Sequence, residues 1–411
     1  MRVWIGIDET DSSEGGCTTY VAYRIALEFS DRLLSPPRLI RFNPNVPRKT
    51  RGNGGLALEI EADDIDALWD RVLEIVEAHR REGEDTGVVL VRDRKKLYEH
   101  YIRTVTDIVE DPPLGLAEKY SYWGSGRGLI GALAAIGFSG PHTYELLTYR
   151  IGKRYVDRKS VEAFDRLTRY TFANVSPHPI IVPHGNDPVL YGIRGTEPRE
   201  LLDGLKIIRS SPYEGYALFI TNQATDAHLI YRKIEDLKPR RPAYIEGRVS
   251  KRPKIIGSHV YLEVEDDTGS IEVFFYRQTG FLRRIALSLE VGDYIGILGG
   301  VREASEERDM TLNAEKLRVY KLVERIRERN PKCPVCGATL KSAGRGKGWK
   351  CKRCGRRGFL EKERIIERPK ITKGVYVGMP DSRRHLLRPP YVIPSVEDRW
   401  KKVDRRPKRV R

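Results

Sequence analysis

The chain has 411 residues, and its 74 Lys and Arg residues against 57 Asp and Glu residues give a formal charge of +17. At about 100–200 residues per domain, this length predicts roughly two to four domains. Hydrophobic residues make up 40% of the chain, and no apolar run approaches the ~20 residues of a membrane-spanning helix, which excludes a membrane protein. Because an acidic residue follows as early as Asp8, we expect no signal peptide and a cytoplasmic location.

The excess positive charge lies entirely in the C-terminal part of the chain. Residues 1–237 contain 31 basic and 35 acidic residues, a net charge of −4, whereas residues 238–411 contain 43 and 22, a net charge of +21. This asymmetry predicts a polyanion-binding region joined to a nearly neutral one. The 32% of charged residues and the presence of only three methionines are typical of thermophile proteins.

Residues 1–140 predict a mixed α/β domain. The apolar run Val3–Ile7 is typical of a buried strand, and it ends at Asp8 in an acidic loop. Apolar residues from Val21 to Leu33 then recur on one face of a helix whose N-terminus falls at Thr18 or Thr19. Further strands are expected at 39–42, 56–60 and 88–91, and further helices at 64–80 and 129–136.

Residues 141–236 predict a ferredoxin-like sandwich, because the expected order of elements is β-α-β-β-α-β. Its strands are expected at 144–150, 179–182, 189–193 and 216–221, and its helices near 161–171 and 198–205. A basic, proline-containing linker then leads into residues 238–323, which predict an OB-fold. Five strands are expected there, at 244–250, 259–264, 271–276, 294–298 and 317–322, with a helix at 279–289 between the third and the fourth.

Residues 328–362 contain two C-x-x-C pairs, each followed by a glycine, and predict a zinc ribbon. The predicted ligands are Cys333, Cys336, Cys351 and Cys354. Four protein thiolates leave no open position for a substrate, so the Zn²⁺ is expected to be structural. The fifth cysteine, Cys17, is expected to be a small packed residue. Residues 363–411 form a basic tail for which we expect no packed core of its own.

The OB-fold, the zinc ribbon and the local charge of +21 together predict nucleic-acid binding. OB barrels bind single strands by stacking bases on aromatic rings and by contacting phosphates with Lys and Arg. The expected contacts lie on the first OB loop and around the cysteines: Arg248, Lys251, Arg252, Lys350, Lys352 and Arg353. Charge alone does not distinguish RNA from DNA.

The loop after the first strand has the composition of a phosphate-transfer site. The carboxylates of Asp8 and Asp11 suit Mg²⁺, and Thr18 stands at a helix N-terminus, where backbone N–H groups accept phosphate. Two Gly-rich basic segments could bring backbone and positive charge to a nucleotide, and their candidate residues are Arg51, Gly52, Gly126, Arg127 and Gly128. By themselves, these loops are equally compatible with solvated caps and surface turns.

These motifs resemble the archaeal tRNA-isoleucine agmatidine synthetase (TiaS) family. The resemblance is carried by Met1–Ser13, Cys17–Thr19, Thr50–Gly54 and Gly126–Gly137, followed by the OB-fold and the zinc ribbon in the same order. It implies a kinase-like first domain and ATP-dependent attachment of agmatine to C2 of the wobble cytidine in a CAU-anticodon isoleucine tRNA. The product nucleoside, agmatidine, pairs with A instead of G, so that the tRNA reads the codon AUA. It also implies that ATP ends as AMP and phosphate and that the threonine matching Thr18 becomes phosphorylated.

Under this resemblance, Asp8 and Asp11 position Mg²⁺, Thr18 handles phosphate, and Arg51 and Arg127 face ATP. Agmatine is cationic, so an acidic pocket near the first two domains is expected to bind it, with Asp226 as the candidate. Two other classes stay open from the residues themselves. One is a non-enzymatic single-stranded nucleic-acid-binding protein. The other is an ATP-dependent nucleic-acid ligase, which needs a lysine in a K-x-D/N-G setting that we do not find at a strand end.

Overall fold

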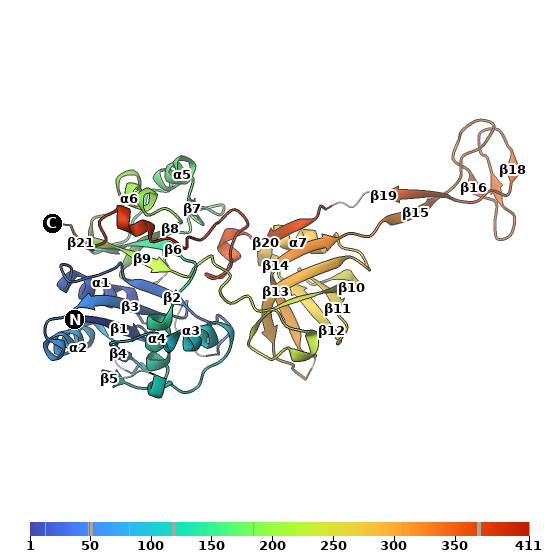
Figure 1. The fold of residues 1–411 in the computed structure, drawn as a ribbon. Coiled ribbons are helices and arrows are strands. Elements are labelled where there is room, and N and C mark those ends of the chain that lie inside the picture. The colour runs from blue at the N-terminus through green and yellow to red at the C-terminus, as the bar shows by residue number, and fades with distance from the viewer. Residues whose placement is uncertain are drawn as a thin grey trace.

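The computed structural model describes residues 1–12, 14–47, 49, 52–81, 83–116, 121–183, 185–306, 308–367 and 371–410. An α/β body, a β-barrel beside it and a small ribbon held away from both make up the molecule (Figure 1). The multidomain α+β architecture expected from the sequence is therefore confirmed. None of the helices in the described ranges has the length and apolar character that a bilayer crossing requires.

A ten-stranded sheet forms the body, in the order β5-β4-β1-β3-β2-β9-β6-β8-β7, with β21 paired to β9. Its first half contains β1 (Arg2–Asp8), β2 (Arg38–Arg41), β3 (Gly54–Glu61), β4 (Gly87–Val91) and β5 (Ser121–Gly124). The helices of this half are α1 (Thr18–Glu28), α2 (Ile65–His79), α3 (Leu97–Thr106) and α4 (Gly126–Gly137), with a short 3-10 turn, η1 (Leu114–Leu116). The sequence did not predict α3 or β5.

Alternation along β1 decides which side chain faces which helices. Val3, Ile5 and Ile7 pack in one core with residues of α1 and α2, whereas Trp4 packs in the other core with residues of α3 and α4. Asp8 continues the Trp4 series, so its carboxylate lies on the α4 side of the sheet. This alternation brings the acidic loop to the helix that carries the second Gly-rich segment.

The second half of the sheet has the ferredoxin-like order. It contains β6 (Thr143–Arg150), α5 (Arg158–Leu167), β7 (Thr171–Phe172), β8 (Val189–Gly195), α6 (Pro198–Ile207) and β9 (Tyr213–Thr221). The strand expected at 179–182 is wrong: these residues form a loop, and the short β7 takes that place in the sheet. Pro177, Pro179 and Pro183 explain the error, because proline cannot donate a ladder hydrogen bond.

The two halves are continuous with each other. Strand β2 pairs in parallel with β9, through Arg38 with Ile220 and Leu39 with Thr221. The boundary that we predicted at residue 140 therefore falls in a connection between elements and does not interrupt the sheet.

The barrel contains β10 (Pro242–Ile256), β11 (His259–Glu265), β12 (Ser270–Phe275), α7 (Phe281–Ala286), β13 (Tyr294–Arg302) and β14 (Thr311–Lys321). Short 3-10 turns precede β10 at η2 (Ile234–Asp236) and α7 at η3 (Arg277–Thr279). A parallel pairing of β12 with β14 closes the sheet into a barrel. Helix α7 lies between the third and fourth strands of the barrel, as the OB-fold requires.

The zinc ribbon stands at the end of a two-stranded stalk, which is clear in Figure 1. The stalk pairs β15 (Arg325–Arg329) with β19 (Glu363–Glu367). The ribbon itself contains β16 (Lys341–Ser342), β17 (Trp349–Lys350) and β18 (Arg357–Gly358).

The C-terminal tail returns to the barrel and then to the α/β body. Strand β20 (Gly374–Val377) pairs with β14, and β21 (Lys408–Arg409) pairs with β9. Between them lie the 3-10 turns η4 (Pro380–Ser382) and η5 (Arg399–Lys402). The tail contributes Leu386 and Trp400 to the core of the body, so it packs on the core of another domain.

Replacing Trp400 with Ala tests this docking. The indole is only 8% exposed, and its loss should reduce the stability of the α/β body by roughly 3 kcal/mol. Thermal unfolding of the variant should therefore begin at a lower temperature than that of the wild type. The neighbouring exposed Lys401, changed to Ala, is the control, and equal melting of both variants would contradict a docked tail.

Candidate active site

A cavity of about 760 Å³ opens between the two halves of the body and the tail. The first half lines it with Asp8, Asp11, Cys17, Thr18, Arg41, Lys49 and Gly52. The second half contributes Glu145, Asp187, Arg194 and Gln223, together with the loop Pro179–Pro183. The tail adds Arg383, Arg384 and His385. This size and this mixture of polar and apolar walls suit a small-molecule or cofactor site.

The acidic loop is held by a tight turn and by close packing against α4. Glu9 has a φ of 53°, a left-handed conformation that is costly for a residue with a side chain and is common at functional sites. The carboxylate of Asp8 lies directly against Gly131 of α4, where a Cβ would lie 1.7 Å from Oδ2 of Asp8. Only glycine leaves room there for the Asp8 carboxylate.

Thr18 is joined to the acidic loop by hydrogen bonds. Its hydroxyl donates to Oδ1 of Asp11 at 3.1 Å and accepts from the backbone N–H of Thr10 at 3.5 Å. Thr18 is also the first residue of α1, and Cys17, Thr18 and Thr19 all line the cavity. The N-terminus of α1 therefore opens onto the cavity, where its partial positive charge favours an anion such as phosphate.

The electrostatics of the loop favour a bound cation. Burial raises the pKa of Asp8 well above its usual value, and the neighbouring charge of Glu9 raises it further. The guanidinium of Arg127 donates to Oε1 of Glu9 at 2.9 Å, and its positive charge lowers the pKa of Asp8 in part. A divalent cation would stabilise the ionised form of Asp8, because it adds positive charge to a desolvated carboxylate.

The carboxylates of Asp8 and Asp11 fit Mg²⁺ in chemistry. Mg²⁺ prefers oxygen ligands and is typically bound by one or two carboxylates together with substrate phosphates and water. The acidic loop does not form a closed cage. Within the described ranges, the four ribbon cysteines are the one set of three or more His, Cys, Asp or Glu side chains whose ligand atoms all lie within 4.8 Å of one another.

The Gly-rich segments contribute in different ways. Gly52 lines the cavity, whereas Arg51 lies outside the described residues. Arg127 reaches the acidic loop through Glu9. Gly126, Arg127 and Gly128 are not among the residues that line the cavity. Gly126 adopts a φ of 50°, and a Cβ on Gly128 would lie 2.1 Å from the carbonyl oxygen of Asp85.

Asp226 lies elsewhere. Its carboxylate forms ion pairs with Lys316 of β14 and with Arg388 of the tail, and it is absent from the cavity lining. The acidic side chains of the second half that do line the cavity are Glu145 and Asp187. Cys17 also lines it, and burial together with the charge of Asp187 raises the pKa of its thiol to about 12, so it is a poor nucleophile.

Sequence reasoning missed a cluster of polar residues that line the cavity. It consists of Arg41, Glu145, Arg194, Gln223 and His385, which come from β2, β6, β8, the end of β9 and the tail. Two signals in the sequence pointed toward it: the polar residues directly after the last ferredoxin-like strand, and the basic run of the tail. Neither signal shows which strands are neighbours.

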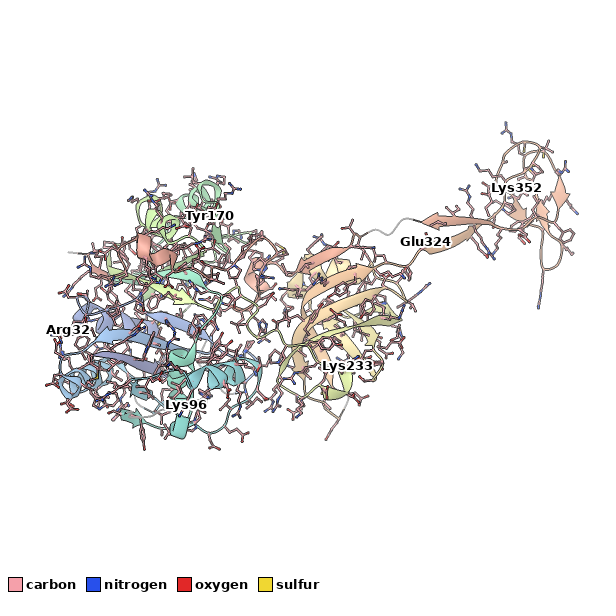
Figure 2. The ribbon with its side chains drawn as sticks, in the orientation of Figure 1. Arg32, Lys96, Tyr170, Lys233, Glu324 and Lys352 are labelled. Atoms are coloured by element: carbon pink, nitrogen blue, oxygen red, sulfur yellow. The ribbon has the colours of Figure 1, made fainter. Side chains whose placement is uncertain are left out.

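The predicted nucleic-acid contacts fall on two separate modules. Arg248, Lys251 and Arg252 are exposed on β10 of the barrel. Lys251 pairs with Glu263 at 2.6 Å, and Arg252 approaches Glu290 at 3.7 Å. Ion pairs at the surface contribute little to stability, so these two basic side chains can readily bind phosphate instead. Lys350, Lys352 and Arg353 are exposed on the ribbon, and Figure 2 places Lys352 at the far end of the molecule from Arg32 of the body.

The four ribbon cysteines are arranged for a metal. The Sγ atoms of Cys333 and Cys354 lie 3.5 Å apart, and those of Cys336 and Cys351 lie 3.4 Å apart. Backbone N–H groups of Cys354 and Arg353 lower the pKa of Cys351 to about 6, which favours the thiolate that Zn²⁺ binds. Four thiolates at these distances fit a structural, tetrahedral Zn²⁺.

Fold and site together define a multidomain α+β protein in which an OB barrel and a zinc ribbon accompany a body with a large polar cavity. Family models match along the chain. They are described as the TiaS TCKD domain at residues 4–63, the TiaS FLD domain at 126–228, an OB-fold nucleic acid binding domain at 243–320 and the TiaS C-terminal zinc ribbon domain at 330–369.

Relatives match the chain from end to end. The isoleucine-tRNA 2-agmatinylcytidine synthetase TiaS of Thermococcus sibiricus is 38% identical, over 97% of this chain and 98% of its own, and that of Archaeoglobus fulgidus is 36% identical, over 95% and 97%. A crystal structure of apo TiaS superimposes with a TM-score of 0.85 at 35% identity, covering 95% of this chain and 97% of that one. The chain belongs to the TiaS family.

Further TiaS structures contain ligands. A complex of TiaS with its isoleucine tRNA and ATP matches with a TM-score of 0.83 at 35% identity, and it covers 95% of this chain and 97% of that one. A complex of TiaS with the same tRNA, AMPCPP and agmatine matches with a TM-score of 0.79 at 32% identity, and it covers 95% of this chain and 96% of that one.

Changing Gly131 to Ala should displace the Asp8 carboxylate, because the added Cβ would overlap Oδ2. We expect ATP turnover to fall at least about tenfold, since a small misplacement of a reacting group costs as much as 10²-fold. The control is Gly115→Ala, where nothing lies within 4 Å of the added Cβ. Turnover assays on both variants check this, and wild-type turnover by Gly131→Ala would contradict the packing argument.

Elemental analysis should find one zinc per chain. Replacing Cys336 with Ser should remove most of it, because a hydroxyl is a poor substitute for a thiolate ligand. Cys17→Ser is the matched control and should retain the zinc, since Cys17 lies in the cavity and not in the ribbon. Equal zinc loss from both variants would show that the metal is not bound at the four ribbon cysteines.

Proposed function

We propose that this protein attaches agmatine to C2 of the wobble cytidine of a CAU-anticodon isoleucine tRNA at the expense of ATP. The observation that carries the proposal is the family relationship, which runs through all four modules, with Asp8, Asp11 and Thr18 lining one large cavity. A tRNA substrate also agrees with the expected cytoplasmic location.

The chemistry requires the C2 oxygen to be activated first. An oxygen on a pyrimidine ring is a poor leaving group, so an amine cannot displace it unaided. Transfer of one phosphoryl group from ATP to that oxygen turns it into a good leaving group, and transfer of the second to Thr18 leaves AMP. The agmatine amine then forms the new C2–N bond, the C2–O bond breaks, and the oxygen departs with the phosphate.

The roles of individual residues follow from their places in the cavity. Asp8 and Asp11 would hold Mg²⁺, which neutralises negative charge on the transferred phosphoryl group. The N-terminus of α1 binds phosphate through its backbone N–H groups, and Thr18 is the group that handles the transferred phosphate. Gly52 lines the cavity on the nucleotide side; Arg51, which lies outside the described residues, and Arg127, which contacts Glu9 of the acidic loop, are assigned to ATP by the family resemblance.

Agmatine carries two positive charges, and the acidic groups of the second half are suited to hold them. Glu145 and Asp187 line that wall. We assign the agmatine side of the cavity to Asp187 in place of Asp226, because Asp187 lines the cavity and Asp226 does not; Glu145 also lines it, but its carboxylate already pairs with Arg194.

RNA binding belongs to the barrel and the ribbon. Arg248, Lys251, Arg252, Lys350, Lys352 and Arg353 would contact the phosphates of the tRNA. An anticodon base is single-stranded and can be turned out of its stack at low cost, so it can enter the cavity. A non-enzymatic nucleic-acid-binding protein is not favoured, because it would not need the acidic loop and the α1 N-terminus at one cavity.

The test is to incubate the protein with ATP, agmatine and unmodified tRNA, and to identify the wobble nucleoside by mass spectrometry. Wild-type protein should produce 2-agmatinylcytidine. Asp8→Asn should abolish product and ATP turnover but leave tRNA affinity nearly unchanged, since the binding charge lies in residues 238–411.

The control variant is Asp63→Asn, whose side chain is 85% exposed. It should match the wild type in product and in tRNA affinity. Absence of agmatine from the wild-type nucleoside would overturn the proposed function. Loss of tRNA binding by Asp8→Asn alone would overturn the assignment of chemistry and RNA binding to separate parts.

A further inference from the structure

Four residues that line the cavity form a hydrogen-bonded chain. Arg194 donates to Glu145 at 2.8 Å, and the amide nitrogen of Gln223 donates to the other carboxylate oxygen of Glu145. The amide oxygen of Gln223 in turn lies 2.9 Å from Nδ1 of His385. The chain thus links strands β6 and β8 of the sheet to the tail.

This chain fixes the protonation pattern of His385. Glu145 is paired with Arg194, so it is an ionised, acceptor-only group, and Gln223 must turn its NH₂ toward it. The amide oxygen of Gln223 therefore faces His385, and an oxygen can only accept, so Nδ1 carries the proton. In a neutral imidazole, Nε2 is then an acceptor.

The surroundings also keep His385 neutral. Burial lowers the pKa of the imidazole well below its usual value, and the positive charges of Arg41 and Arg194 lower it further. His385 is an exposed residue, and it lines the cavity. Nε2 is therefore an unprotonated hydrogen-bond acceptor at neutral pH.

A hydrogen-bond donor stands beside this acceptor. A Cβ built on Gly52 would lie 2.7 Å from Nη1 of Arg41 and 3.1 Å from Nε2 of His385, so both nitrogens lie beside Gly52 and are no more than 5.8 Å apart. Nε of Arg41 is buried and has no hydrogen-bond partner within the described part of the chain. Arg41 also lines the cavity, so its guanidinium is placed to donate to a ligand there.

We propose that His385 and Arg41 read the Watson–Crick edge of the wobble cytosine and so exclude uridine. Cytosine presents a donor, its N4 amino group, beside the acceptors N3 and O2, which complements an acceptor and a donor standing side by side. Uracil presents an acceptor, O4, beside the N3–H donor, so both contacts are reversed. A site built to hydrogen-bond one pattern rejects the inverted one strongly, because its own buried polar groups are left unpaired.

This inference rests on the proposed function but concerns selectivity, so it is tested by ratios of rates. The substrates are three tRNAs that differ at position 34 only: cytidine, uridine, and a cytidine analogue that lacks the 4-amino group. The variant is His385→Asn, which keeps a donor for Gln223 at the position of Nδ1 and removes Nε2. Ile393→Asn, at a 78% exposed position in the same tail, is the matched control.

The wild type and the control should both lose about 10-fold to 100-fold in agmatine incorporation when the 4-amino group is removed, and more with uridine. His385→Asn should react more slowly with cytidine, lose almost nothing further when the amino group is absent, and show a much smaller cytidine-to-uridine ratio. Comparing both proteins on the RNAs with and without the 4-amino group forms a double-mutant cycle, which isolates the contact between Nε2 and the amino group.

A uniform slowing of all three substrates by His385→Asn would overturn the inference, because a merely structural role lowers every rate by one factor. Affinities of the same three RNAs, measured without ATP and agmatine, distinguish this outcome from failure of the proposed function. Suppose that no product forms with the wild type, so that the proposed function fails. A reduced preference of His385→Asn for binding the cytidine RNA would then still support the inference, and an unchanged preference would overturn it.

Discussion

The parallel pairing of β2 with β9 is the contact on which the cavity depends. It joins the half of the sheet that carries the acidic loop to the half that carries Glu145 and Arg194. Asn222, directly after β9, strengthens the joint, because its buried side chain exchanges two hydrogen bonds of 2.8 Å with the backbone of Arg41. A parallel pair of strands far apart in the chain costs loop-closure entropy, and burial in a ten-stranded sheet offsets that cost.

Charges of both signs line the cavity. The β1–α1 side carries the acidic loop, where the partial positive charge of a helix N-terminus favours phosphate and a bound cation would add to it. The tail contributes Arg383 and Arg384, and the β6–β8 wall contributes Glu145 paired with Arg194. A site with both acidic and basic groups suits one anionic and one cationic reactant together, because each reactant finds complementary charge.

Local patterns in the sequence predicted most of the elements but not their neighbours. The run Val3–Ile7 and the apolar face of α1 were sufficient to place Asp8, Asp11 and Thr18 on one loop and one helix end. The C-x-x-C pairs predicted the zinc ribbon, because four thiolates at that spacing have one common structural use. By contrast, the strand expected at 179–182 failed, since apolar residues there line a cavity and prolines interrupt them.

The cluster of polar residues that line the cavity could not be predicted from the sequence. Gln223 and His385 are 162 positions apart, and no periodicity relates a residue after a strand to one in a basic tail. The candidate Asp226 illustrates the same limit. A lone carboxylate after a strand could face a substrate or a basic neighbour, and the neighbour here is Lys316 of the barrel, which only the tertiary fold brings near.

The tail also determines how the barrel faces the cavity. Arg384 lines the cavity and pairs with Glu315 of β14 at 3.0 Å, while Glu315 also contacts His228 at 3.4 Å. One step along β14, Lys316 pairs with Asp226, which accepts from the backbone of Arg388 at 2.8 Å. Buried ion pairs add little to the net stability of a protein, but they form only when the charged groups are held in one geometry. A junction built from them holds the barrel in one orientation, so an RNA strand bound to the barrel meets the cavity in a fixed register.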